Sequence, residues 1–124
     1  MKTVLLIDDS KTQLLSAKFT LQHGGYRVEA ITDPSTALDK IKELHPDLII
    51  TDINMPGKDG ITLVREVRQL PEFSATPLLI MSTDSQKHLF DQARAAGATG
   101  WLMKPVKQED LLITVTKLLS REHT

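Results

Sequence analysis

Cysteine is absent from this chain of 124 residues, and aromatic residues make up only 4% of it. The lack of cysteine excludes disulfide bonds and thiolate metal sites. No apolar run approaches the roughly 20 residues that a membrane-spanning helix needs. The apolar run that follows Met1-Lys2-Thr3 is too short for a signal peptide. We therefore expect a cytoplasmic protein that does not enter the membrane.

Neither sign of charge is in excess, because 15 Lys and Arg face 16 Asp and Glu, for a formal net charge of −1. Without a basic surplus to neutralise phosphates, nucleic-acid binding is not expected. The length suits one domain, and no repeat, low-complexity tract or linker divides the chain. We expect residues 1–124 to form a single domain with no output domain after it, and the protein to be a monomer.

Short apolar runs recur along the chain and indicate strands. Most are continuous hydrophobics, which is typical of strands buried on both faces of a parallel sheet. The run around Val28 instead alternates apolar and polar residues, which predicts an edge strand. The predicted strands are Val4–Ile7, Arg27–Ile31, Leu48–Thr51, Leu78–Ser82 and Gly100–Met103.

Apolar residues at helical spacing lie between and after these runs, and we expect these faces to pack into the core. Gly24-Gly25 should stop the first helix, and Asp33 should cap the second with Pro34 in its first turn. The first helix shows two apolar faces, Leu15 with Phe19 and Leu14 with Ala17 and Leu21. The four later helices show one face each: Ala37, Leu38, Ile41 and Leu44; Leu63, Val64, Val67 and Leu70; Leu89, Phe90, Ala93 and Ala96; and Leu111, Leu112, Val115, Leu118 and Leu119.

Strand and helix alternate through the whole chain, which predicts an α/β fold with a parallel sheet covered by helices on both faces. Right-handed crossovers leave few topologies for such a pattern. For five strands the natural choice is the flavodoxin-like (βα)5 three-layer sandwich with strand order 2-1-3-4-5.

Acidic side chains follow two of these strands. Asp8 and Asp9 come after the first strand, and Asp52 comes after the third. The order 2-1-3-4-5 makes these strands neighbours, so the three carboxylates should meet at the carboxyl edge of the sheet. One like-charge pair at about 4 Å costs roughly 4 kcal/mol at an effective dielectric of about 20. Either pKa values rise or a cation lies between the groups, and oxygen ligands without His or Cys suit Mg²⁺.

Two further polar side chains belong to the same edge. Lys104 follows the fifth strand and can supply a cation for an oxyanion, and Ser82 at the end of the fourth can donate a hydroxyl. A carboxylate can act as a nucleophile toward phosphorus and form an acyl phosphate, and Asp52 is the best placed to do so. The histidines His23, His45, His88 and His123 show no ligand spacing and are interpreted as surface residues.

Four motifs in the right order resemble the receiver domains of bacterial two-component systems, most closely the single-domain regulators of the CheY type. They are Leu6–Ser10, Asp52–Gly60, Ser82-Thr83 and Gly100–Pro105. Each alone is weak, but each follows a strand, and the resemblance covers essentially the whole chain.

The resemblance implies a role for each matching residue. Asp52 would be the phosphoacceptor, and Lys104 would pair with the incoming phosphoryl group. Mg²⁺, or Mn²⁺ in its place, would be bound by Asp52 and Asp9, by Asp8 directly or through water, and by the backbone carbonyl of Asn54.

The switching residues are also implied by the resemblance. The hydroxyl of Ser82 would move to bond the phosphoryl group, helped by the backbone amide of Thr83, and Trp101 would be the switch aromatic. The side chains of Asn54 and Asp84 lie where the family tunes dephosphorylation.

The chain departs from the family at two positions. Thr83 replaces the usual Ala or other small residue beside the acceptor, and Val106 stands where Phe is common. Because Thr83 is bulkier than the usual residue, it affects the expected access to the phosphorylation site and the expected rate of reaction there. Val106 weakens the subfamily assignment. The resemblance also implies a cis peptide at Lys104-Pro105.

The implied function is two-component signal transduction. A histidine kinase would pass its phosphoryl group to Asp52, and the change would alter binding to a downstream protein such as a flagellar motor switch. The protein is expected not to be an enzyme beyond assisting its own phosphotransfer and dephosphorylation. A phosphorelay intermediate, or a receiver fragment of a larger regulator, is the alternative.

Three other functions fit the sequence less well. An aspartyl-nucleophile phosphatase would separate its two acids by one residue, whereas Asp8 and Asp9 are adjacent. A flavin carrier would need a hydroxyl- and Gly-rich loop in place of these acids. A degenerate receiver that serves only as a scaffold is disfavoured by the intact acids, Ser82 and Lys104.

Overall fold

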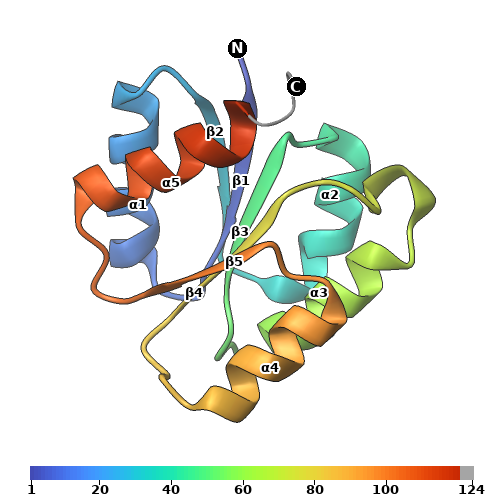
Figure 1. The fold of residues 1–124 in the computed structure, drawn as a ribbon. Helices are drawn as coiled ribbons and strands as arrows, with labels where there is room; N and C mark the ends of the chain where they lie inside the picture. The colour runs from blue at the N-terminus through green and yellow to red at the C-terminus, as the bar shows by residue number, and fades with distance from the viewer. Residues whose placement is uncertain (121–124) are drawn as a thin grey trace.

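Five parallel strands form one sheet in the order β2-β1-β3-β4-β5 in the computed structural model, which describes residues 1–120 (Figure 1). The strands are β1 (Thr3–Ile7), β2 (Arg27–Ile31), β3 (Leu48–Asp52), β4 (Leu78–Ser82) and β5 (Gly100–Met103). The predicted fold class and strand order are confirmed. The strand β2 lies at the edge, as its alternating pattern predicted. Two strands run one residue beyond prediction, because Thr3 pairs with Arg27 and Asp52 pairs with Met81.

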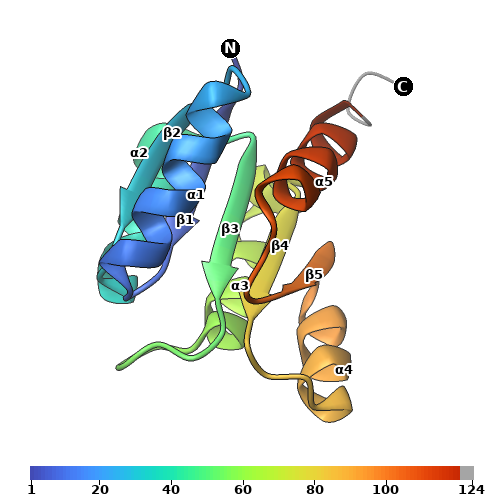
Figure 2. The ribbon, with the colours of Figure 1, turned by 90° about the vertical axis from the view of Figure 1, so that its left-hand side faces the viewer.

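Helices cover both faces of the sheet; Figure 1 shows a helical layer on either side of the strands, and Figure 2 looks onto one of these layers. The helices are α1 (Lys11–His23), α2 (Ala37–Leu44), α3 (Gly60–Arg68), α4 (Lys87–Ala96) and α5 (Gln108–Ser120). One core joins α1 and α5 to the sheet through residues such as Leu6, Ile50 and Val115. The other joins α2, α3 and α4 to it through residues such as Ile49 and Val64. Alternate residues of β3 thus enter opposite cores, as a central strand requires.

Two predicted helix boundaries lie at or near the residues that predicted them. Gly24 ends α1, donating its N–H to main-chain carbonyls of the last turn. Asp33 caps a short 3-10 turn, η1 (Pro34–Thr36), and α2 begins directly after it. The Asp33 carboxylate accepts hydrogen bonds from the hydroxyl and the amide of Ser35, and these bonds hold its pKa below the usual range.

Three residues of the predicted core faces are exposed instead. Leu15 and Phe19 are 67% and 59% exposed, because α1 turns Leu14 and Leu21 toward the sheet and leaves its second apolar face in solvent. Phe90 on α4 is also exposed, at 41%. A helix in an outer layer buries one stripe, so a second stripe on the same helix stays outside.

Arg68, at the end of α3, joins two connections of the chain, the one between α3 and β4 and the one between α4 and β5. Its guanidinium donates to the carbonyls of Phe73 and Thr76 at 2.8 and 2.7 Å and to that of Gly97 at 3.0 Å. The first two acceptors lie in and after the 3-10 turn η2 (Pro71–Phe73), and the third ends α4. Burial lowers the pKa of Arg68. Within residues 1–120, no helix has both the length and the apolar character to cross a membrane.

Candidate functional site

The carboxyl ends of the strands bring five of the predicted site residues to one edge of the sheet. Asp8 and Asp9 follow β1, and Asp52 and Ser82 are the last residues of β3 and β4. Lys104 follows β5, and its amide donates to the carbonyl of Ser82 at 2.8 Å, which extends the pairing of the last two strands beyond Met103. The peptide bond between Lys104 and Pro105 is cis, as predicted.

Three carboxylates meet at this edge, as the strand order predicts. Asp8, Asp9 and Asp52 each offer an oxygen, and these oxygens all lie within 4.8 Å of one another. Asp8 is buried, Asp52 is half-buried and Asp9 is exposed. The backbone holds two of them, because Asp8 accepts from the amide of Ser10 at 2.9 Å and Asp52 from that of Ile53 at 2.7 Å. Each of these two still has a second oxygen for another partner.

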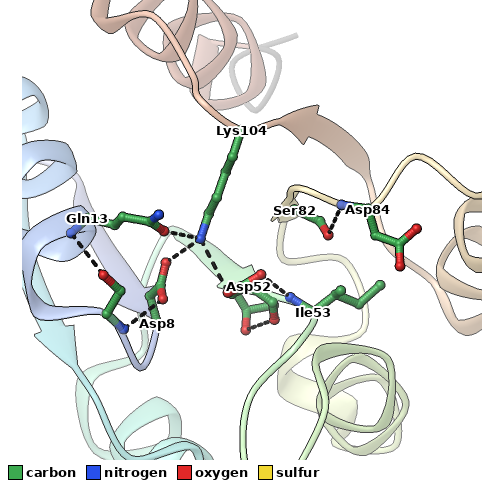
Figure 3. A network of polar contacts seen from close by, with 9 residues as sticks. Asp8, Gln13, Asp52, Ile53, Ser82, Asp84 and Lys104 are labelled. Atoms are coloured by element: carbon green, nitrogen blue, oxygen red, sulfur yellow. Dashed lines mark hydrogen bonds and ion pairs between the residues drawn. The ribbon is translucent and has the colours of Figure 1, made fainter.

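Lys104 places its ammonium between the carboxylates of Asp8 and Asp52 (Figure 3). Its Nζ lies 2.6 Å from Oδ2 of Asp8 and 3.2 Å from Oδ2 of Asp52. The Lys104 side chain is 6% exposed, and those of Asp8 and Asp52 are 10% and 12% exposed. Screening by water is therefore weak here, and each charge acts strongly on its neighbours.

The donor set fits a hard divalent cation. Three carboxylates against one ammonium leave two negative charges unbalanced in a largely buried cluster. The ligand atoms are carboxylate oxygens, which Mg²⁺ prefers, and the exposed Asp9 leaves one side open to water, which Mg²⁺ retains when bound. The residues that could hold the ion are thus Asp8, Asp9 and Asp52.

The hydroxyl of Ser82 makes its hydrogen bond outside the cluster of Asp8, Asp9 and Asp52. Its side chain is fully buried, and its Oγ accepts from the amide of Asp84 at 3.0 Å. The carboxylate of Asp84 in turn accepts from the amide of Gln86 at 3.0 Å, directly before α4 begins. In Figure 3 the Ser82 hydroxyl turns toward Asp84. The end of β4 is thereby joined to the start of α4.

Trp101 lies on β5, apart from the acids and next to α4. It is half-buried, and its ring centroid is 5.7 Å from that of Phe90 with the planes at 54°. Its Nε1 donates to Sδ of Met103 at 3.3 Å. Both aromatic rings line a pocket of about 190 Å³ between α4 and β5, which also includes Arg94. The structure therefore places Trp101 on a surface of α4 and β5.

The remaining predicted positions are exposed. Asn54 lies in the loop after β3, and Thr83 follows the last residue of β4. Of the histidines, His23, His45 and His88 are exposed, as predicted, and His123 lies outside the described residues.

Four contributors to the site were missed by sequence reasoning. Gln13, in the first turn of α1, places Oε1 against the ammonium of Lys104. The amide of Ile53 holds the Asp52 carboxylate. Ser10 caps α1, and its hydroxyl accepts from the amide of Gln13 at 3.4 Å. The sequence did carry a signal for Gln13. A helix that begins at this edge of the sheet places the side chains of its first turn beside the acids, and Gln13 is three residues after the N-cap.

Gly60 is the other missed residue. A Cβ at this position would lie 2.3 Å from the carbonyl oxygen of Asp52 and 2.9 Å from Cα of Ile53. Its amide donates to the Ile53 carbonyl at 2.9 Å. The absence of a side chain thus lets α3 begin against the end of β3, where Asp52 is held.

Comparisons with known proteins agree with this architecture. The model of the family described as the response regulator receiver domain matches residues 4–116. A solved structure of the Vibrio cholerae chemotaxis protein CheY4 superposes with a TM-score of 0.92 at 39% identity, covering 96% of this chain and 99% of that one. Protein PilH of Pseudomonas aeruginosa is 30% identical over 120 residues, which is 97% of this chain and 99% of PilH.

A further relative is much longer than this chain. The putative two-component response regulator ARR21 of Arabidopsis thaliana is 40% identical over 110 residues, which is 87% of this chain. The match spans 17% of the plant protein. The family model and the PilH match each cover nearly the whole described chain, and the chain belongs to the response regulator receiver domain family.

Proposed function

We propose that this receiver takes a phosphoryl group from a histidine kinase onto Asp52, with Mg²⁺ bound by Asp8, Asp9, Asp52 and the carbonyl of Asn54, and that residues 1–124 act as a single domain. The observation that carries the proposal is the cluster of three carboxylates at one edge of the sheet, two of which pair with the ammonium of Lys104. That cluster has the ligands for a divalent ion and a carboxylate nucleophile at the same place.

The transfer is a nucleophilic displacement at phosphorus. Oδ2 of Asp52 forms a P–O bond to the phosphoryl group as the P–N bond of the phosphohistidine breaks, and the leaving imidazole nitrogen takes a proton. Oδ1 of Asp52 remains held by the amide of Ile53, so one oxygen is oriented for attack. Dephosphorylation is a separate hydrolysis, in which water attacks phosphorus and loses a proton to solvent. The P–O bond to Asp52 breaks, so Asp52 returns to a free carboxylate and inorganic phosphate is released.

The charges around Asp52 assist this reaction. Mg²⁺, when bound, would offset the negative charge on the phosphoryl oxygens. Lys104 already lies 3.2 Å from the acceptor oxygen, so its ammonium can pair with the incoming group without a large movement. A charge placed in advance in a poorly screened site lowers the barrier more than one that must be gathered from solvent.

The switch follows from a change of partner for Ser82. The phosphoryl oxygens would draw its hydroxyl away from the amide of Asp84, helped by the Thr83 amide, and so loosen the link to α4. Trp101, which packs on Phe90 of α4, would change its position with it. Such a change is a population shift between two states that differ by a few kcal/mol, and it alters the face made by α4, β5 and α5.

The pathway is proposed to be control of chemotaxis or motility. The support is the similarity to a chemotaxis protein, CheY4, over 96% of this chain. The output would then be binding to a downstream protein such as a flagellar motor switch, by a monomer in the cytoplasm. The protein would act by assisting its own phosphotransfer and dephosphorylation, without turnover of another substrate. A phosphorelay intermediate would be recognised by onward transfer to a second histidine.

The direct test is phosphorylation with acetyl phosphate in Mg²⁺, followed by intact mass spectrometry and peptide mapping. The parent should gain one phosphoryl group at Asp52, and chelation of Mg²⁺ should prevent the gain. Asp52→Asn should gain none. Asp59→Asn is the matched control, because Asp59 lies in the same loop and only caps α3, a role that Asn also fills. Equal labelling of Asp52→Asn and the parent would overturn the assignment of the acceptor.

The same preparation tests the rival functions. Rapid multiple turnover of a generic phosphate ester would support the aspartyl-nucleophile phosphatase. A yellow protein with flavin absorbance would support an electron carrier. A colourless protein that labels once and slowly loses the label is the outcome expected of a receiver.

A further inference from the structure

The ammonium of Lys104 has three acceptors, and only two of them are acids. Asp8 and Asp52 accept at 2.6 and 3.2 Å, and the third acceptor is Oε1 of Gln13. An ammonium has three N–H donors, so this set saturates it. Figure 3 shows the three acceptors around Nζ, with Gln13 reaching it from α1.

The fold holds Gln13 at this place. It lies in the first turn of α1, where the hydroxyl of Ser10 accepts from its amide. Its side chain lines a small cavity together with Asp8 and Asp52, and it also lines the neighbouring pocket of about 160 Å³ together with Lys104. Gln13 thus stands between the acid cluster and that pocket, into which an untethered lysine could turn.

We propose that Gln13 is a positioning residue that holds the Lys104 ammonium over Asp52; this inference rests on the proposed phosphotransfer. A lysine stem has four rotatable bonds, so the charge needs a fixed partner to stay in place. The carboxylates of Asp8 and Asp52 cannot serve throughout, because the same oxygens are needed for the metal and for phosphorus. A neutral amide oxygen holds the ammonium without adding negative charge that would repel the phosphoryl group.

The test removes the amide and keeps the shape of the side chain. Gln13→Met is unbranched and of similar length but offers no strong acceptor. Loss of one hydrogen bond to a charged group should slow Asp52 labelling at saturating acetyl phosphate by roughly tenfold. Gln22→Met is the matched control, since Gln22 is an exposed glutamine on the same helix, away from the acids. Its labelling rate should stay within about twofold of the parent.

A double-mutant cycle separates positioning from a general structural effect. In a Lys104→Met background, Gln13→Met should have no further effect, because the group through which Gln13 acts is gone. The second readout is binding of beryllofluoride in Mg²⁺ by calorimetry, which requires no turnover. Gln13→Met should weaken this binding severalfold with Lys104 present and leave it unchanged in the Lys104→Met background.

Each outcome decides one of the two claims. If the parent labels at Asp52 and Gln13→Met labels as fast, the positioning role is wrong and the proposed function stands. The positioning role is also wrong if the effect of Gln13→Met is equally large without Lys104. If the parent itself gains no label at Asp52, the proposed function has failed before Gln13 is reached.

Discussion

Gly60 offers the sharpest test of how the fold supports the site. In Gly60→Ala the new Cβ would lie 2.3 Å from the carbonyl oxygen of Asp52 and 2.9 Å from Cα of Ile53. Both obstructing atoms belong to the backbone, so no side chain can turn aside. Either the start of α3 or the end of β3 must move by about 1 Å to restore an ordinary contact distance.

The expected loss of stability combines two opposing effects. Overpacking against a fixed backbone costs about 1–3 kcal/mol, and the better helix propensity of alanine returns up to about 1 kcal/mol. The net loss in the free energy of unfolding should be about 1–2 kcal/mol, measured by urea denaturation. The larger effect should be on Asp52 labelling by acetyl phosphate, because the residue that moves carries the acceptor. We expect that rate to fall by at least roughly tenfold, since a small misplacement of reacting groups is costly.

Gly57→Ala is the matched control in the same loop. Gly57 has a φ of +87°, and a Cβ there would meet nothing within 4 Å. The left-handed backbone alone should cost about 1–2 kcal/mol. The two variants should therefore lose similar stability, but only Gly60→Ala should lose labelling. Equal labelling of both variants, or an unchanged stability of Gly60→Ala, would refute the argument from close approach.

Three further predictions concern other parts of the fold. Arg68→Met removes a charged donor from three main-chain carbonyls and should lower the free energy of unfolding by about 3 kcal/mol; a urea midpoint equal to that of the parent would contradict this. Asp33 has a lowered pKa, so its contribution to stability is present above its unfolded pKa of about 3.9 and is lost as the pH falls through the lower folded value. Asp33→Ala should therefore lower the free energy of unfolding in urea at neutral pH, but hardly at all well below the folded pKa. A destabilisation that grows as the pH falls would contradict this prediction. Ser82→Ala should still label at Asp52 but should lose the accompanying change in Trp101 fluorescence, and a full fluorescence response would exclude Ser82 as the switch.

The fold and the acid cluster were predictable because both follow from regular patterns. Continuous apolar runs mark the buried strands β1, β3 and β4, and the alternating run marked β2 as an edge, but the apolar run of β5 forms the other edge and is only partly buried. Once β1 and β3 are neighbours, residues that follow them must meet at one edge, which brings Asp8 and Asp52 together. Lys104 was located in the same way, from its place directly after β5.

The remaining features depend on side-chain directions that such patterns do not specify. Leu15 and Phe19 are spaced as a core face, but exposure depends on which face of α1 the sheet occupies. The contact of Gln13 with Lys104 joins residues far apart in sequence through the ends of two flexible side chains. The hydrogen bond from the Asp84 amide to Ser82 arises from the local turn after β4, which the apolar pattern leaves undefined.

The structure of the protein with Mg²⁺ and beryllofluoride tests the central claim most directly. We predict a metal ion about 2.0–2.1 Å from carboxylate oxygens of Asp9 and Asp52, the beryllium bonded to Asp52, and Nζ of Lys104 within hydrogen-bonding distance of a fluoride. A metal ion bound elsewhere, or a Lys104 side chain turned away into the pocket beside α1, would contradict it.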